Sequence, residues 1–324
     1  MGSYAIPCIQ SSRVLTVRIE FATPGVVAAE VALVAGSGGT QVRAASPAAP
    51  EVEFAGLAPG EYAVDLSLLG GDGAVLASGR FERIGIGTVL CAVGDSLTEG
   101  YLGHGFWRDD LELTAASFPV SAVSRDGRNF PQYAPTTARH KPEVNCFQSW
   151  LTRLNDVLAA SWREPVFLAN EGMGGYTTGH YLAMMRNNQG GWRDRMRLLG
   201  PTVWLIHLGV NDERQKVSPA TFGANLRAMV ELLQTDFGAA PDRIYIARPS
   251  YDYAPGAAAI LRQYCDCIDA LVAERKLRAG PDFFAVFAGD RERWYGSDPV
   301  HPGPEGMDLM ADLWHGILAR QRTP

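Results

Sequence analysis

Hydrophobic and polar residues alternate in short bursts along the first part of the chain. Between residues 13 and 82 the apolar positions recur at every second residue, in segments such as VLTVRIEF and YAVDLSLL. Clusters rich in glycine and proline separate these segments at the spacing typical of short strands joined by turns. The pattern predicts a small antiparallel β-sandwich. No pairing of a nucleophile with a base is visible within it.

The pattern changes after residue 87. Short apolar runs then alternate with longer segments whose apolar residues recur at helical spacing. The apolar runs predict buried strands over residues 88–93, 165–169, 202–208, 243–247 and 283–287. The helical patterns cover residues 147–162, 218–237, 257–276 and 304–320. Strands that alternate with helices predict a parallel sheet covered by helices on both faces.

These two patterns predict two domains. Residues 83–87 contain two glycines and mark the expected boundary. We expect a β-sandwich accessory domain over residues 1–86 and an α/β catalytic domain over residues 87–324. Within the second domain, residues 101–145 show no regular pattern and are rich in glycine, proline and aromatic residues. The aromatic content favours an ordered insert near the site, lining a pocket or packed on the body.

Composition excludes several classes of partner. The chain has 324 residues, of which 47% are hydrophobic and 20% charged, as in ordinary globular proteins. Its net charge of −6 argues against nucleic acid or an anionic membrane as the main partner. No apolar run is long enough to span a membrane. Residues 1–13 lack the features of a signal peptide, and the compartment stays open.

The cysteines indicate reduced thiols. There are five of them, an odd number, and none stands in the CxxC spacing typical of metal sites. We therefore expect structural thiols and no disulfide framework.

Polar residues follow the predicted strands at their carboxyl ends. Ser96 follows the strand over residues 88–93, within the sequence GDS, and Asn211 follows the strand over residues 202–208. Ligands bind at this edge of an open α/β sheet. A serine there can act as a nucleophile if other segments supply a base, an acid that orients the base, and donors for an oxyanion. Gly-Asp-Ser is also an ordinary turn sequence, so the tripeptide alone does not identify Ser96 as a nucleophile.

Other segments at this edge can supply those groups. The glycine-rich sequence NEGMGG, residues 170–175, can expose backbone N–H groups. The Asn211 amide can donate to an oxyanion, although asparagine also forms turns and helix caps. Asp298 and His301 stand three apart in a loop with two prolines, where the carboxylate can orient the imidazole. An isolated pair of this kind equally fits a salt bridge or half a metal site. Taken together, the groups are those that acyl transfer requires.

Four of these segments resemble a known family. GDSL at 94–97, NEGMGG at 170–175, GVND at 209–212 and DPVH at 298–301 look like the four blocks of the SGNH, or GDSL-type, hydrolases, in family order. The resemblance covers roughly residues 88–320. It implies a flavodoxin-like three-layer α/β/α domain with about five parallel strands and a reaction without metal or organic cofactor. The N-terminal module lies outside it, and its residues 54–69 resemble a corner of immunoglobulin-like and fibronectin-type-III domains.

The resemblance also implies a role for each triad residue. Ser96 is the expected nucleophile, and His301 is the expected general base and later acid. Asp298 is expected to orient the imidazole. Asp95, beside the nucleophile, is then expected to stabilise the turn.

The expected oxyanion hole has three donors. They are the backbone N–H of Ser96, the backbone N–H of Gly175 and the side-chain amide of Asn211. Gly175, the sixth residue of its block, is chosen over Gly172 and Gly174. Loss of one such donor is expected to cost roughly 3–4 kcal/mol of transition-state stabilisation.

These roles indicate a serine esterase that hydrolyses short acyl esters, acetyl esters first, through an acyl-enzyme. We favour a carbohydrate O-acetyl esterase, because of the accessory sandwich, the aromatic insert that can stack on sugar rings, and the lack of a long apolar cap. A GDSL-type lipase, lysophospholipase or thioesterase is the first alternative. A non-catalytic glycan-binding protein on a hydrolase scaffold is the second. The sandwich can be a carbohydrate-binding module or a packing domain, and we favour the latter. The oligomeric state is not indicated.

Overall fold

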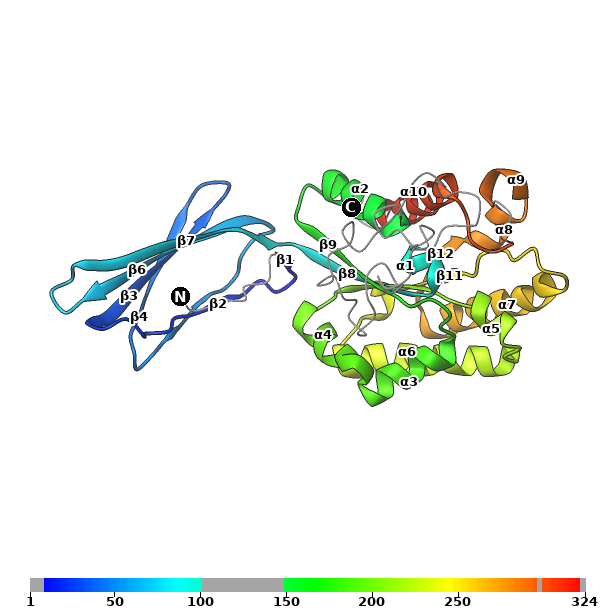
Figure 1. Ribbon diagram of the computed structural model, residues 1–324, viewed down its shortest axis with the longest axis horizontal. Coiled ribbons are helices and arrows are strands. Elements are labelled where there is room, and N and C mark those ends of the chain that lie inside the picture. The colour runs from blue at the N-terminus through cyan, green and yellow to red at the C-terminus, as the bar shows by residue number, and fades with distance from the viewer. Residues whose placement is uncertain (1–8, 101–148, 296–298, 321–324) are drawn as a thin grey trace, which may run out of the picture. The chain divides into compact units, whose positions relative to one another are not determined.

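The computed structural model of the protein describes residues 9–100, 149–295 and 299–320 (Figure 1). The chain forms two compact units. One comprises residues 1–89 and 162–167, and the other comprises residues 90–161 and 168–324. The predicted insert over residues 101–145 and the predicted triad acid Asp298 lie outside the described residues.

The first unit contains the expected all-β region. A five-stranded sheet has the order β1-β7-β6-β3-β4, and a two-stranded sheet pairs β2 with β5. The bounds are β1 Ile9–Gln10, β2 Leu15–Arg18, β3 Val26–Ala35, β4 Thr40–Ala45, β5 Glu51–Phe54, β6 Gly60–Gly70 and β7 Val75–Ile86. Every second residue of β2 and β5 is buried, as the period of a strand requires. The small sheet and the large sheet share one core, to which Val17, Phe54, Val31 and Val64 contribute.

Strand direction in this unit differs from the prediction at one place. Strand β1 pairs with β7 in parallel, whereas the pairs β2–β5, β3–β4, β3–β6 and β6–β7 are antiparallel. Alternation along a strand reports which face is buried and carries no information about the direction of the neighbouring strand. The parallel pair could therefore not be read from the pattern.

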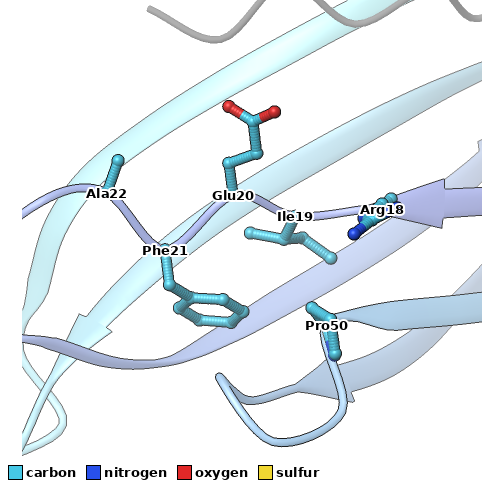
Figure 2. A pocket seen from close by; sticks show the side chains of 6 residues that line it. All are labelled: Arg18, Ile19, Glu20, Phe21, Ala22 and Pro50. Atoms are coloured by element: carbon cyan, nitrogen blue, oxygen red, sulfur yellow. The ribbon is translucent and has the colours of Figure 1, made fainter.

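An open hollow of about 640 Å³ lies beyond the end of β2 (Figure 2). Residues 18–22 and Pro50 line it. The side chains of Ile19 and Phe21 contribute to the core of the unit, and Glu20 projects the other way from the chain (Figure 2). No predicted site residue lines this hollow.

The second unit is built on the expected parallel sheet. Its strands are β8 Thr88–Gly94, β9 Val166–Gly172, β10 Val203–His207, β11 Ile244–Arg248 and β12 Arg278–Asp282. They lie in the order β12-β11-β10-β8-β9, so the first strand stands between the second and the third. This is the flavodoxin-like order, with its switch point between β8 and β10. The fold class predicted from the sequence is confirmed.

Helices cover both faces of this sheet (Figure 1). The bounds are α1 Ser96–Glu99, α2 Trp150–Trp162, α3 Thr178–Asn187, α4 Trp192–Leu199, α5 Val210–Arg214, α6 Pro219–Phe237, α7 Ala257–Arg275, α8 Phe283–Phe287, α9 Arg291–Trp294 and α10 Pro304–Arg320. Helices α3, α4, α6 and α7 share a core with β8 and β10. On the opposite face, Trp150 of α2 stacks on Trp314 of α10 with ring centroids 5.9 Å apart. No helix in the described part of the chain is long and apolar enough to cross a membrane.

The predicted strand over residues 283–287 is wrong. This segment is helix α8, capped by the Asp282 side chain, which accepts a hydrogen bond from the Ala285 N–H at 2.9 Å. The fifth strand is β12, directly before it, with the sequence RAGPD. A short apolar run fits a buried strand and a buried helix equally well. Proline is tolerated in β12 because this strand is at the edge of the sheet.

Candidate active site

Ser96 lies where strand β8 passes into helix α1. The Asp95 side chain accepts a hydrogen bond from the Leu97 N–H at 3.1 Å and so caps the helix, as expected of a turn-stabilising residue. Gly94 has no room for a side chain, because a Cβ there would lie 2.0 Å from Thr98 Oγ1. The Ser96 N–H stands in the first turn, where helices leave backbone donors unpaired, and it donates no hydrogen bond within the described residues.

The structure brings Ser96 and His301 together. The distance from Ser96 Oγ to His301 Nε2 is 2.8 Å. A neutral imidazole protonated on Nδ1 can accept the hydroxyl proton through Nε2. The two residues are 205 positions apart in the sequence, so tertiary structure alone creates this contact. Asp298, the predicted partner of the imidazole, lies outside the described residues.

Backbone hydrogen bonds hold the loop that carries His301. The Tyr253 N–H donates to the Pro299 carbonyl at 3.1 Å, and the Gly303 N–H donates to the Trp294 carbonyl at 2.8 Å. Helix α10 begins immediately after this loop. The loop is thus fixed on both sides of the histidine.

The N–H groups of the glycine-rich segment after β9 are nearly all engaged. Gly172 donates to Asn170 Oδ1, Met173 to the Gly94 carbonyl, Gly174 to Glu99 Oε2 and Tyr176 to the Met173 carbonyl, at distances of 2.8 to 3.1 Å. Within the residues that the structure describes, the Gly175 N–H donates to no protein group. Gly175 has a φ of 78°, which favours glycine. Among the N–H groups of residues 172–176, that of the sixth residue of the segment, Gly175, is therefore the one without an acceptor in the described part of the chain.

Asn211 lies in the first turn of helix α5, which follows the neighbouring strand β10. Its Nδ2 donates to the Tyr176 carbonyl at 3.1 Å. A side-chain amide carries two hydrogens, so one remains for a ligand. In the register of the sheet, Gly94 of β8 lies opposite His207 of β10. Ser96 and Asn211 thus follow adjacent strand ends at the switch point, where ligands bind in this class of sheet.

Two buried carboxyl groups lie behind this edge. Burial raises the pKa of the Asp95 carboxyl to about 7, and the charge of Asp212 adds to the rise. Burial also raises the pKa of Asp212, which accepts hydrogen bonds from the Thr178 backbone N–H at 3.0 Å and from its hydroxyl at 2.5 Å. These contacts tie the start of α3 to α5.

The sequence pattern did not single out two residues that contact this site. Glu99 stands three residues after Ser96, just beyond the GDSL motif, and that proximity was the only signal. Tyr181 stands in the apolar pattern of α3, where nothing distinguishes it from a core tyrosine. Within residues 9–100, 149–295 and 299–320, no group of three or more His, Cys, Asp or Glu side chains could hold a metal ion.

Comparison with known proteins identifies the family of this chain and a solved structure with a similar fold. The model of the GDSL-like lipase/acylhydrolase family matches residues 92–309. No curated protein matches the chain. The psychrotrophic esterase EstA from Pseudoalteromonas sp. is 16% identical, with a TM-score of 0.50 over 74% of this chain and 100% of that one.

Two further solved structures are similar to this chain. A lipase/acylhydrolase from Enterococcus faecalis is 20% identical, with a TM-score of 0.48 over 72% of this chain and 97% of its own. An acetylxylan esterase from Geobacillus stearothermophilus is 17% identical, with a TM-score of 0.46 over 72% of this chain and 94% of its own.

Proposed function

Because the chain belongs to the GDSL-like lipase/acylhydrolase family and is a serine hydrolase of ester bonds, we propose that Ser96 is its nucleophile and His301 its general base. The observation that carries this proposal is the 2.8 Å distance between Ser96 Oγ and His301 Nε2. A serine becomes nucleophilic when a base within hydrogen-bond reach takes its proton. Asp298, three residues before the histidine, is proposed to orient the imidazole.

The proposed reaction proceeds through an acyl-enzyme. His301 takes the Ser96 proton while Oγ attacks the ester carbonyl, and the alcohol then leaves with that proton. Water repeats the sequence and releases the acid. The tetrahedral oxyanion is proposed to accept hydrogen bonds from the Ser96 N–H, the Gly175 N–H and the Asn211 amide. Support for these three donors comes from their hydrogen-bonding state, since each has an N–H without a protein acceptor among the described residues.

The test of the nucleophile is Ser96→Ala. We predict that this variant loses more than about a thousandfold of kcat for a small aryl acetate, because no other group forms the acyl-enzyme. Hydrolysis is followed by release of the phenol, and circular dichroism checks the fold. Mass spectrometry after treatment with a serine-directed organophosphate should place the adduct on Ser96.

Ser250→Ala is the matched control. Ser250 also follows a strand of the same sheet, and its Oγ lies 3.4 Å from Nε2 of a histidine, His207. We expect this variant to retain its activity. Full activity of Ser96→Ala, or an adduct on another serine, would refute the assignment.

We further propose that the substrate is a short acyl ester, in the first place an O-acetyl group on a carbohydrate. The aromatic residues of the insert over residues 101–145, which can stack on sugar rings, support this choice, as does the additional all-β unit. A lipase, lysophospholipase or thioesterase is the alternative.

A panel of esters tests the substrate class. We predict that kcat/KM is higher for an aryl acetate than for the matched octanoate, and that acetylated xylan or another acetylated glycan releases acetate. The Ser96→Ala protein serves as the blank for every ester. A preference for octanoate would contradict the carbohydrate proposal and favour the lipolytic alternative.

A further inference from the structure

Side chains outside the proposed triad join the two backbone segments that carry oxyanion donors. One segment is residues 94–99, which comprise the last residue of β8 and helix α1 with Ser96, and the other is the glycine-rich segment that contains Gly175. Glu99 contacts the glycine-rich segment from the end of α1. Tyr181 contacts both segments from helix α3.

Glu99 holds the glycine-rich segment against the helix that carries the nucleophile. Its Oε2 accepts a hydrogen bond from the Gly174 N–H at 2.8 Å, and its backbone carbonyl accepts one from Asn170 Nδ2 at 3.4 Å. The backbones touch directly, since a Cβ on Gly172 would lie 2.2 Å from the Glu99 nitrogen. The next N–H along the chain after Gly174 is that of Gly175. An anchored Gly174 amide therefore restricts the direction in which the Gly175 N–H points.

The Tyr181 hydroxyl, which helix α3 carries, contacts the same two segments. Its side chain is fully buried, and its hydroxyl donates to the Gly94 carbonyl at 2.7 Å and to the Glu171 carbonyl. One hydroxyl carries one proton, so the two carbonyls share it. Gly94 stands two residues before Ser96, and Glu171 belongs to the glycine-rich segment. Burial raises the pKa of Tyr181 well above its ordinary value, so the hydroxyl remains a donor at neutral pH.

We propose that Glu99 and Tyr181 are positioning residues of the esterase reaction, which hold the backbone donors of Ser96 and Gly175 at the separation that one oxyanion needs. This inference rests on the proposed function of Ser96. Donors stabilise a transition state when they are fixed before the charge develops. Their misplacement raises the barrier more than it weakens substrate binding. The proposal thus requires a fall in kcat with little change in KM.

Tyr181→Phe tests the hydroxyl, and Tyr264→Phe is its matched control. Tyr264 is also fully buried, and its hydroxyl also donates to a backbone carbonyl, that of Val217. For an aryl acetate, we expect Tyr181→Phe to lower kcat about ten- to a hundredfold with KM within about twofold. We expect Tyr264→Phe to keep kcat within about twofold of the wild type. Equal kcat values in the two variants would overturn the role of Tyr181.

Two substitutions test Glu99, one expected to lower the activity and the other to restore it. Glu99→Ala removes the acceptor for the Gly174 N–H, whereas Glu99→Gln keeps a side-chain oxygen in its place. We expect kcat to fall about tenfold or more in Glu99→Ala and to return to within about threefold of the wild type in Glu99→Gln. Equal activity of the alanine variant and the wild type, or of the two variants with each other, would overturn the role of Glu99. If Tyr181→Phe fails to fold, the Glu99→Ala and Glu99→Gln variants still test the positioning of the backbone donors.

The Ser96→Ala protein separates this inference from the proposed function. Ester hydrolysis that survives Ser96→Ala overturns the proposed function and the positioning roles with it. Hydrolysis that depends on Ser96 but is unaffected by Tyr181→Phe and Glu99→Ala overturns the positioning roles alone. A fall in kcat in both, rescued by Glu99→Gln, is the expected result.

Discussion

Two serine–histidine pairs stand at the carboxyl edge of the sheet, and burial distinguishes them. Ser250 Oγ lies 3.4 Å from His207 Nε2, and Ser96 Oγ lies 2.8 Å from His301 Nε2. His207 is only 2% exposed, and burial lowers its pKa to about 3. An imidazole with that pKa is a poor base at neutral pH. The pair that contains Ser96 is also the closer one, so residue-scale chemistry favours it as the reacting pair.

The buried carboxyl of Asp95 should make the free energy of unfolding depend on pH. Its pKa of about 7 in the folded protein lies above the ordinary value of 3.8, so folding favours the protonated form. This contribution is complete below about pH 4 and is lost as the pH rises to about 7. Asp95→Asn stays uncharged and keeps an oxygen that can accept from the Leu97 N–H. We predict that the stability of the wild type relative to Asp95→Asn falls by about 2–4 kcal/mol between pH 4 and pH 7.

Urea unfolding of both proteins across this range measures the difference. Comparing the two cancels the contribution of His207, which has the opposite sign because burial lowers its pKa. Its neutral form is favoured by folding, so that contribution grows as the pH rises from about 3 to about 6.5. A difference between the two proteins that does not change with pH would contradict the assigned charge state of Asp95.

At the scale of elements, a glycine sets how closely strand β9 approaches helix α1. A Cβ on Gly172 would lie 2.2 Å from the Glu99 nitrogen and 2.6 Å from the Thr98 carbonyl carbon. Both atoms belong to backbone, which cannot rotate away as a side chain can. The glycine is thus required by packing, and its φ is not in the left-handed region. The contact keeps the glycine-rich segment beside the nucleophile.

Gly172→Ala should therefore separate the two elements. We predict a loss of about 1–3 kcal/mol or more in the free energy of unfolding, as in other overpacked sites, together with lower kcat. Gly316→Ala in helix α10 is the control, because a Cβ there meets no atom within 4 Å. It should leave kcat unchanged and stabilise the protein by about 0.5–1 kcal/mol, since alanine is the better helix former. Urea titration and steady-state kinetics give both quantities. A Gly172→Ala protein as stable and active as the control would refute the packing argument.

At the scale of the molecule, the all-β unit and the α/β unit each bury hydrophobic residues of their own in the described part of the chain. The core that includes Val31 and Phe54 belongs to the all-β unit, and the core that includes Trp204 and Phe222 belongs to the α/β unit. A protein with a single domain commonly unfolds in one cooperative, two-state transition. Chains with several domains commonly depart from two-state unfolding. A group attached covalently to Ser96 lies in the α/β unit, so it changes the contacts of that folded unit and not those of the other.

Scanning calorimetry should detect the unfolding of the two units separately. We predict a calorimetric enthalpy larger than the van't Hoff enthalpy, from two overlapping transitions. The Ser96 adduct with an organophosphate should change the midpoint of one transition and leave the other in place. Ser96→Ala treated in the same way is the control. A single two-state transition in both samples would contradict this prediction.

Local sequence patterns were sufficient for the four longest described helices and for four of the five strands of the parallel sheet. The helical pattern over residues 304–320 matches α10 exactly in its bounds, and the strand over 243–247 differs from β11 by one residue at each end. The failure at residues 283–287 has a local cause, because five apolar residues fit either kind of element. Strand β12 was missed because its sequence RAGPD has neither an apolar run nor alternation.

By itself, the sequence determined the fold class, the longest helices and most strands of the parallel sheet, and the motifs that contain Ser96 and His301. These features depend on neighbours along the chain, which periodicity and motif spacing report. Only the tertiary structure decided that Ser96 Oγ and His301 Nε2 lie 2.8 Å apart, that the Gly175 N–H has no acceptor among the described residues, and that Tyr181 joins two strand ends. Such contacts arise between segments that packing brings together from distant parts of the chain, and no local pattern encodes their distances.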